Sequence, residues 1–409
     1  MNKKSAVVLA VGALFAAPAL SQTTASTVQI YGRLFPQFAS SKSSGATAAG
    51  AVPSNLVTNT GGDHAQRYSV DANTSRIGFR GQEDLGSGMR AIWQIETRIR
   101  LDTGSGGAWA DRDSFVGLRG NFGNVRLGIS RTIYRLYGTA VGMFDITPGN
   151  IVSPSEVLSG VGLDQNGTGF HVRKQNTVIY ETPEFGGFQA GIQYSPDEAK
   201  GNPGRTLDRR LWSYGVKYRA KQFYVSLAQE RHYDFFDGSL NVASGVANRT
   251  AALAPSVAGT DPRSKDTATR LSVKYEITPQ HELAADLARL EFTESGQAGA
   301  GRFESYKKTT WAVGWEARWG GPWRTSLSYV RAGDGECTLS GGVACSTDGL
   351  KGNHANAGLA YDFSKRTYLF AIVSRLDNGP SARFSTAANY NPSRGADLTQ
   401  WALGVRHAF

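Results

Sequence analysis

Short segments in which apolar and polar residues alternate recur along most of the chain, and this pattern constrains the fold more than any other feature. In residues 311–319, three tryptophans and a valine share one face, while small or charged side chains share the other. Residues 28–34, 89–98 and 401–409 alternate in the same way. Side chains point to opposite faces in a strand, whereas a helix needs a period of about 3.6 residues. The pattern therefore predicts strands with one apolar and one polar face.

The connections between these segments are alternately short and long. Gly, Pro, Asp and Asn dominate the short ones, as tight turns require. The seven short connections lie at 84–88, 121–123, 183–186, 220–222, 278–280, 320–322 and 362–365. The eight long ones lie near 40–72, 101–111, 132–172, 195–209, 233–267, 293–305, 333–352 and 377–396. Fifteen connections join sixteen strands.

An even number of alternating strands of roughly 9–11 residues is typical of a transmembrane barrel. Strands in lipid must pair every backbone polar group, and closing the sheet removes its edges. Eight long loops would be unusual in a compact soluble domain. We therefore predict an all-β fold, a 16-stranded antiparallel transmembrane β-barrel with short periplasmic turns and long extracellular loops.

The first residues indicate export. Lys3 and Lys4 precede an apolar run at 6–20, and small residues follow, which is typical of a cleaved secretory signal peptide. We predict that residues 1–21 are the signal peptide and that 22–409 form the barrel. Of the 44 Lys and Arg, removal of these two lysines leaves 42 against 34 acidic residues, a net charge of about +8 instead of +10.

Composition excludes several other classes of protein. Two cysteines cannot supply a disulfide-rich scaffold or a Cys-rich zinc framework, and the six histidines show no HxxxH or HExxH spacing. The basic residues are spread evenly, which argues against nucleic acid as a partner. We predict no catalytic centre, metal site or cofactor.

From residue 27 onward, several motifs resemble the trimeric general porins of Gram-negative bacteria, specifically the betaproteobacterial type. They lie at 27–32, 75–88 with its continuation to Glu96, 115–123, 176–188, 363–367 and 404–409. The resemblance implies an outer-membrane homotrimer whose third long loop, 132–172, folds into the lumen. It also implies contact with outer-membrane lipids and lipopolysaccharide. One departure is the sequence at 128–131, Gly-Ile-Ser-Arg, where the family usually has a Gly-Arg-Gln step.

A channel of this family performs no covalent chemistry, so the residues of interest are the inward ones. Strand alternation directs five arginines inward, and we predict a basic wall of Arg33, Arg76, Arg80, Arg98 and Arg126. The resemblance places acids of the third loop opposite this wall, namely Asp145, Glu156 and Asp164. These charges would orient polar solutes in a water-filled channel with a weak preference for anions. Alternatively, the arginines are ordinary wet lumen residues or pair with Glu83 and Glu96, and the loop acids are merely solvated.

Three other functions compete with passive diffusion. A substrate-selective channel for phosphate or carboxylates would use a longer basic ladder, and five further cations share the inward parity: Lys217, Arg219, Lys274, Arg318 and Arg324. An outer-membrane hydrolase is another possibility, because His171, His232 and His281 have acids nearby, but no GxSxG motif occurs. Adhesion through the loops has no specific sequence support.

Three further structural features are expected. Cys337 and Cys345 should form a disulfide in the seventh long loop, because exported proteins meet an oxidising compartment. Aromatic residues with outward parity should form a membrane girdle, namely Trp311, Trp315, Trp319, Trp323, Tyr194, Tyr218, Tyr275, Tyr361 and Phe409. Outward residues of the fourth and fifth strands should meet a neighbouring barrel, namely Phe115, Gly117, Val125 and Leu127.

Overall fold

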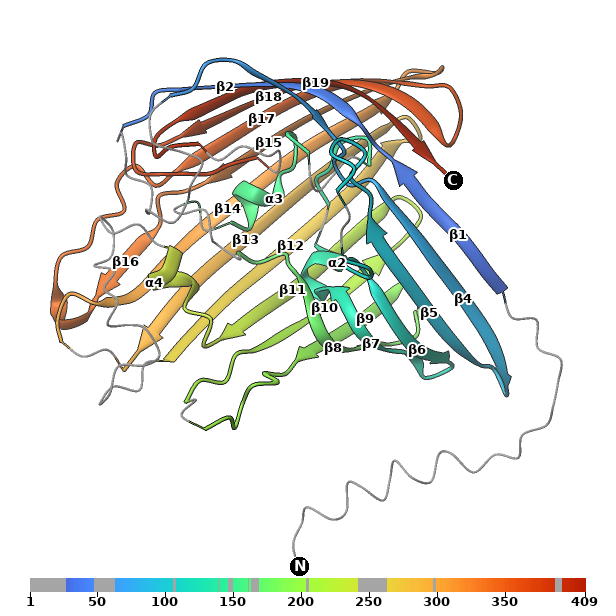
Figure 1. Ribbon diagram of the computed structural model, residues 1–409, viewed down its shortest axis with the longest axis horizontal. Helices are drawn as coiled ribbons and strands as arrows, with labels where there is room; N and C mark the ends of the chain where they lie inside the picture. Colours follow the sequence, from blue (N-terminus) through green and yellow to red (C-terminus); the bar gives the residue numbers. More distant parts are fainter. Residues whose placement is uncertain are drawn as a thin grey trace, which may run out of the picture.

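The computed structural model describes residues 27–47, 63–105, 108–138, 140–145, 150–160, 162, 169–203, 206–241, 263–296, 299–386 and 392–409. In this part of the chain an antiparallel sheet curves round and closes on itself (Figure 1). The predicted signal peptide, residues 1–21, lies outside the described residues, and so does Asp164.

The barrel wall has sixteen strands in the described residues, two of which are interrupted. The first is β1 (Thr27–Leu34) with β2 (Gln37–Ser44), and the second is β3 (Arg67–Asp71) with β4 (Arg76–Gly86). The others are β5 (Met89–Arg98), β6 (Ser114–Gly120), β7 (Gly123–Arg131), β8 (Arg173–Glu181), β9 (Phe188–Ser195), β10 (Arg210–Arg219), β11 (Phe223–Tyr233), β12 (Arg263–Thr278), β13 (His281–Ser295), β14 (Phe303–Arg318), β15 (Trp323–Ala332), β17 (Gly352–Asp362), β18 (Thr367–Asn378) and β19 (Asp397–Ala408).

Closure joins the last strand to the first. β19 pairs with β2 from Asp397 opposite Ser44, and with β1 where Arg33 lies opposite Ala408. The first strand breaks at Pro36, which lacks the N–H that a ladder needs. Phe35 keeps its backbone bonds there, because its N–H donates to Ser75 Oγ at 2.8 Å and its carbonyl accepts from Asn73 at 3.0 Å. The closed ladder confirms the predicted fold class.

The seven short turns and eight long loops fall where the sequence predicts them, but several strands are longer than expected. β2 runs to Ser44, β3 begins at Arg67 and β12 begins at Arg263, all inside segments predicted as loops. The ends of β2 and β12 carry polar residues on both faces, so the apolar alternation stops before the strand does, whereas the short β3 keeps Tyr68 and Val70 on its outer face. The apolar band on such a barrel is only about 25 Å tall, which leaves room for polar strand ends beyond it.

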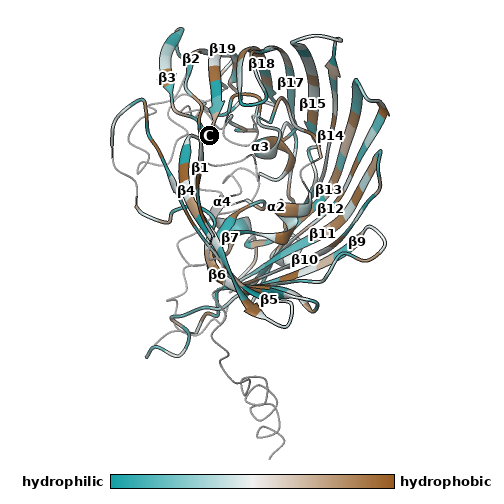
Figure 2. Cartoon of the chain, turned by 90° about the vertical axis from the view of Figure 1, so that its right-hand side faces the viewer, coloured by the Kyte–Doolittle hydropathy of each residue, from teal (hydrophilic) through white to brown (hydrophobic). Residues whose placement is uncertain are grey.

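Apolar and polar residues alternate along many of the strands, which gives them the brown and teal bands of Figure 2. The apolar side chains of the outward positions are exposed. Val28, Leu227, Leu287 and Leu403 are between 50% and 65% exposed, as lipid-facing residues of a barrel are. The predicted girdle aromatics also lie on this face, where the Tyr194 ring packs at a tilt against Trp212 and the Trp323 ring packs edge-on against Tyr361. Among the described residues, no helix is long and apolar enough to cross a membrane.

The predicted outward direction is wrong for Phe115 and Gly117. Gly117 lies opposite Arg126, and the Arg126 guanidinium is 5.2 Å from the centre of the Phe115 ring. Arg126 is inside the barrel, and residues directly opposite each other share a face. The outward residues of β6 are therefore Val116 and Leu118, while Leu127 of β7 is outward as predicted.

Five small elements belong to the loops of the described residues. Helices α2 (Ile133–Tyr137) and α3 (Ser155–Leu158) lie in the third loop, and α4 (Asp237–Asn241) lies in the fifth; all three are within the ring of strands (Figure 2). In the seventh loop, β16 (Glu336–Leu339) pairs with β14 and is followed by the 3-10 turn η2 (Ser340–Gly342). Cys337 and Cys345 are joined there by the expected disulfide, with their Cα atoms 5.8 Å apart.

Candidate functional site: a charged lumen beneath the third loop

The third loop enters the lumen immediately after β7 and is fastened to the inner wall by α2. Thr132 caps this helix, since its Oγ1 accepts from the Arg135 N–H at 3.3 Å. The first two helical N–H groups donate to the wall, Ile133 to Gln193 Oε1 at 3.1 Å and Tyr134 to Ser213 Oγ at 2.8 Å. The unsatisfied donors of a helix start are thus paired with side chains of β9 and β10.

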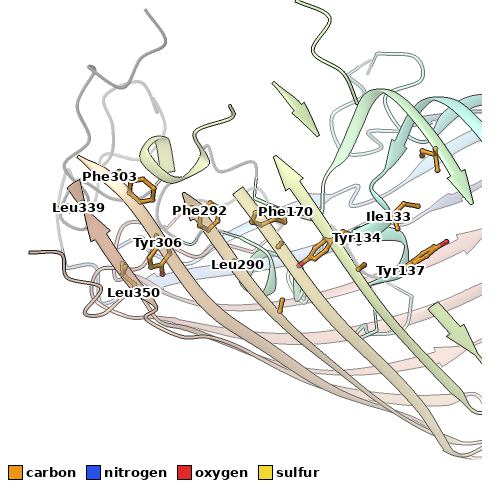
Figure 3. Packing of buried hydrophobic residues seen from close by; sticks show 14 residues of the cluster. Ile133, Tyr134, Tyr137, Phe170, Leu290, Phe292, Phe303, Tyr306, Leu339 and Leu350 are labelled. Atoms are coloured by element: carbon orange, nitrogen blue, oxygen red, sulfur yellow. The ribbon is translucent and has the colours of Figure 1, made fainter. Parts of the chain in front are cut away.

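Apolar packing holds the same helix against the wall. Figure 3 shows Ile133, Tyr134 and Tyr137 at one end of a row of buried rings and aliphatic side chains that continues through Phe170 to Phe292 and beyond. Gly191 makes room for the helix, because a Cβ there would lie 2.8 Å from Ile133 Cδ1 and from the Tyr137 hydroxyl. The inner wall is therefore shaped to receive this loop.

The middle of the loop reaches the opposite arc of the barrel. The N–H of Val141 donates to Asp286 Oδ2 at 2.9 Å, and that of Phe144 to Glu316 Oε2 at 3.1 Å. The carbonyl of Phe144 accepts from the Tyr368 hydroxyl. Two wall carboxylates thus serve as acceptors for loop backbone, so they are only partly available to solutes.

The returning part of the loop is bound through its carbonyl groups. The Ile151 carbonyl accepts from His354 and from Ser374, each at 3.0 Å, and the Leu158 carbonyl accepts from Thr310 at 2.6 Å. The Gly160 carbonyl accepts from Lys308 at 2.7 Å. The loop is thus held along the wall at several points, which agrees with the inward fold that the family resemblance implies.

A cavity of about 510 Å³ remains between the loop and the wall. One side is lined by six arginines, here called the arginine cluster: Arg33, Arg76, Arg112, Arg131, Arg135 and Arg173. The facing arc, built by β12, β13 and β14, contributes Lys274, Glu276, Glu282, Glu316 and Arg318, and Asp145 of the loop also lines the cavity. The two sides therefore differ in the sign of their charge.

Carboxylates inside the arginine cluster neutralise part of it. Glu96 pairs with Arg76 at 3.1 Å and with Arg112 at 2.5 Å. Asp113 pairs with Arg131 at 2.7 Å and with Arg173 at 2.8 Å. Two carboxylates against six guanidiniums leave an excess of four positive charges on this side, whereas the facing arc has three carboxylates against two cations.

The electrostatic environment of the loop residues agrees with this excess. Burial alone would raise the pKa of the Asp113 carboxyl, but the attraction of Arg131 and Arg173 outweighs it and holds that pKa well below its usual range. Burial, together with repulsion from Arg173 and Arg131, lowers the pKa of Arg135 to about 9. Both groups remain charged at neutral pH.

The structure brings together only two of the five arginines of the predicted basic wall. Arg33 and Arg76 line the cavity, and Arg33 donates to the Asp145 carbonyl at 3.2 Å. Arg80 is inward but outside the cavity lining, where it donates to Gln29 at 2.9 Å. Arg98 lies 3.8 Å from Asp111, and Arg126 pairs with Glu181, so each is matched by a nearby carboxylate. The alternative pairing with Glu96 holds for Arg76.

The predicted loop acids differ in their surroundings. Asp145 lines the cavity beside Arg33, with a backbone φ of 59° in the left-handed region. Glu156 lies in α3 outside the cavity lining, and burial raises its pKa, although Arg135 opposes the shift. Asp164 is outside the described residues. Of the two acids that the structure describes, only Asp145 lines the cavity.

Sequence reasoning missed four of the six members of the arginine cluster. Arg112 and Arg135 lie in loops, where strand alternation predicts nothing. Arg131 and Arg173 lie opposite each other beyond a shift in the register of β7 and β8, between Gly128 and Ser130. A bulge of this kind interrupts the strict alternation of sides. The unusual residues at 128–131 were the available signal, since they end in Arg131.

The five cations of the alternative basic ladder are mostly matched by partners. Lys274 pairs with Glu282 at 2.7 Å, and Arg324 with Asp362 at 2.7 Å, while Arg318 lies 3.8 Å from Glu316. Lys217 and Arg219 lie over tyrosine rings, 4.4 and 5.3 Å from their centres. Within the described ranges, no group of three or more His, Cys, Asp or Glu side chains is arranged to hold a metal ion.

The chain resembles outer-membrane proteins in sequence and in fold. It is 32% identical over 154 residues to the major outer membrane protein P.IB of Neisseria gonorrhoeae, covering 38% of this chain and 40% of that protein. A P.IB protein of Neisseria meningitidis serogroup B is 31% identical over 258 residues, covering 60% of this chain and 70% of that protein. The chain thus spans well under two thirds of the first of these relatives.

The same fold occurs in the anion-selective porin from Comamonas acidovorans. That structure matches with a TM-score of 0.67 at 24% identity, over 94% of this chain and all of the other. The family description "Gram-negative porin" matches residues 6–381, which is most of the chain. With its closed barrel, inward loop and charged lumen, the chain belongs to the Gram-negative porin family.

Proposed function

We propose that this outer-membrane barrel is a general diffusion porin, through which small hydrophilic solutes and ions pass without catalysis and with a weak preference for anions. The observation that carries the proposal is the 510 Å³ cavity beneath the third loop, with the arginine cluster on one side and carboxylates on the other. The structurally similar porin from Comamonas acidovorans is anion-selective, which agrees with this preference.

Opposite charges across a narrow gap create a transverse field. Water and polar solutes align their dipoles in such a field, whereas an apolar solute must displace oriented water. The excess of four positive charges in the arginine cluster lowers the energy of an anion more than that of a cation. Asp145 and the acids of the facing arc keep the preference weak.

A substrate-selective anion channel is favoured less by the same contacts. Such a channel would need a continuous series of available cations along the lumen. Lys274 and Arg324 instead pair with carboxylates, and Lys217 lies against the Tyr137 ring. The positive charge is therefore concentrated at the cavity and not distributed as a ladder.

Conductance in planar bilayers tests the proposal. We expect large ohmic steps, a reversal potential of the anion-preferring sign in a salt gradient, and no saturation with salt. Small steps that saturate and are blocked by phosphate or a dicarboxylate would favour the selective channel instead. Absence of conductance from folded protein would refute passive diffusion altogether.

We also propose that the barrel forms a homotrimer. The corrected outward face of β6 and β7 presents Val116, Leu118 and Leu127, and β1 adds Val28 and Ile30. A contiguous apolar face of this kind suits contact between barrels as well as contact with lipid. Replacing Val116 with Lys should convert the trimer to monomers, measured by native mass spectrometry, whereas Leu287→Lys on β13 should not.

A band of outward cations supports lipopolysaccharide as a further partner. At the loop ends of β10 to β18, seven cations share the parity of the exposed leucines and valines: Arg210, Arg231, Lys265, Arg289, Lys307, Arg331 and Arg375. Basic side chains at this level suit anionic phosphate groups of the outer leaflet. Replacing Arg231, Lys265 and Lys307 with Gln should weaken binding of lipopolysaccharide, measured by co-purification, and leave conductance unchanged.

A further inference from the structure

A shallow apolar groove lies on the outer surface close to where the barrel closes. Its volume is about 760 Å³, and its lining comes from β15, β17, β18, β19, β2 and β3. Leu359, Leu369 and Leu403 form its sides and are 41%, 46% and 53% exposed, so they face away from the lumen.

Cross-strand pairing explains why the surface is hollow here. Ala371 on β18 lies directly between Leu359 of β17 and Leu403 of β19. The next outward row has Leu369 between Tyr361 and Val405. Opposite side chains in neighbouring strands are only about 5 Å apart, so the small Ala371 side chain between larger leucines leaves a depression with apolar sides.

The periplasmic end of the groove is marked by aromatic rings. Trp323 and Tyr361 are 4.9 Å apart between ring centres, and Tyr361 and Phe363 are 5.1 Å apart. Tryptophan and tyrosine concentrate at the boundary between hydrocarbon and headgroups. The row therefore places that boundary at the turn between β17 and β18.

The same turn carries two adjacent cations, Lys365 and Arg366, both exposed. No carboxylate of the described residues forms an ion pair with either of them. Ala371 lies five residues along β18 from Arg366, roughly 17 Å at ~3.4 Å per residue. This span is close to the ~15 Å half-thickness of a hydrocarbon core.

We propose that the groove is a binding site for one anionic glycerophospholipid of the periplasmic leaflet. One acyl chain lies over Ala371 between the leucines, and the phosphate lies beside Lys365 and Arg366. A second barrel is a poorer occupant, because its apolar face would leave the two cations without an anionic partner. The two cations at one end of the groove match an anionic headgroup, and the apolar depression at Ala371 matches an acyl chain, so one amphiphile can occupy both.

Native mass spectrometry of the purified full chain in detergent tests the site. The protein is titrated with phosphatidylglycerol, which is anionic, and with phosphatidylcholine, which is not. We expect the first phosphatidylglycerol to bind at least threefold more tightly than phosphatidylcholine. Lys365→Glu with Arg366→Glu should abolish this preference, and Ala371→Phe should weaken binding of both lipids at least threefold.

Matched controls separate the site from general effects. Ala190→Phe places the same ring on the lipid-facing side of β9, and Lys221→Glu reverses a charge in the exposed turn between β10 and β11. Both should bind lipid as the unaltered protein does. If Ala371→Phe fails to fold, Ala371→Leu fills the same depression with a smaller side chain.

Two results would overturn the proposal. One is lipid binding that is unchanged in the filled and charge-reversed variants. The other is loss of the oligomer in Ala371→Phe with lipid binding intact, which would assign the groove to a second copy of the chain.

Discussion

Neutralising one guanidinium of the arginine cluster should reduce the preference for anions by a calculable amount. Arg131 is suited to this test, because its side chain is 44% exposed to the cavity. Its partner Asp113 keeps Arg173 at 2.8 Å when Arg131 is replaced. Glutamine at position 131 can still donate a hydrogen bond to Asp113, so Arg131→Gln removes charge with little change in packing.

The size of the effect follows from the dimensions of the cavity. A sphere of 510 Å³ has a radius of about 5 Å, so a lining guanidinium is ~7 Å from an ion at the centre. At a dielectric constant of ~80 the pair energy is about 0.6 kcal/mol, and a Debye length of ~10 Å at 0.1 M salt halves it. Anions and cations shift in opposite directions, so their permeability ratio changes by ~0.6 kcal/mol, roughly threefold.

Salt concentration provides the decisive comparison. At 1 M salt the Debye length is ~3 Å, and the same calculation leaves a change of only about 1.2-fold. The assay is the reversal potential in planar bilayers, at low and at high mean salt. Arg289→Gln, on the outer face of β13, is the matched control and should change nothing. An unchanged ratio at 0.1 M, or an equal change at 1 M, would refute the assignment of the field to this cluster.

Three further outcomes are expected. Gly358→Val should displace the loop and alter single-channel conductance, because a Cβ there would lie 2.7 Å from Phe144 Cε2; Gly321→Val, in open space, should not. Burial raises the pKa of Glu156, so the protonated carboxyl stabilises the folded state in acid, and this contribution is lost as the pH rises above ~4.3. Glu156→Gln should therefore remove this part of the pH dependence of thermal unfolding. Cys337→Ser should make the seventh loop easier to cleave with protease, without changing conductance.

Strand alternation was sufficient to predict the wall of the barrel, because a strand in a membrane needs an apolar, lipid-facing side chain at every second residue. The predicted turns and loops follow the same logic, and their number was confirmed. The prediction failed where this requirement ends. The polar ends of β2 and β12 have no apolar face to reveal them, and in β3 only Tyr68 and Val70 mark the outer face. The outward prediction for Phe115 and Gly117 is wrong because Gly117 lies across the ladder from Arg126, which is inward.

The charged cavity was only partly predictable, for a different reason. Arg33 and Arg76 lie on regular strands, so parity alone places them inside. Arg112 and Arg135 are brought to the cavity by loop backbone, and Arg131 with Arg173 by a register shift. Neither the path of a loop nor a shift in register can be predicted from the alternation of residues in the sequence. The odd or even position of a residue in a strand also does not reveal whether an inward charge has an ion-pair partner, as the pairing of Arg126 with Glu181 illustrates.

Charged residues at the inward positions of this barrel either hold the third loop or set the electric field of the pore. The charge of a residue alone therefore does not predict its role in the lumen. Asp286 and Glu316 look like acids of a pore, yet they accept the N–H groups of Val141 and Phe144 and so hold the third loop. A buried backbone donor that loses its acceptor costs roughly 1–3 kcal/mol. A substitution at either carboxylate therefore changes the position of the loop together with the field, whereas the Arg131 guanidinium donates to Asp113, just before β6, and its replacement changes the field alone. Selectivity and pore width are consequently coupled at the anchoring acids and separable at the exposed arginine.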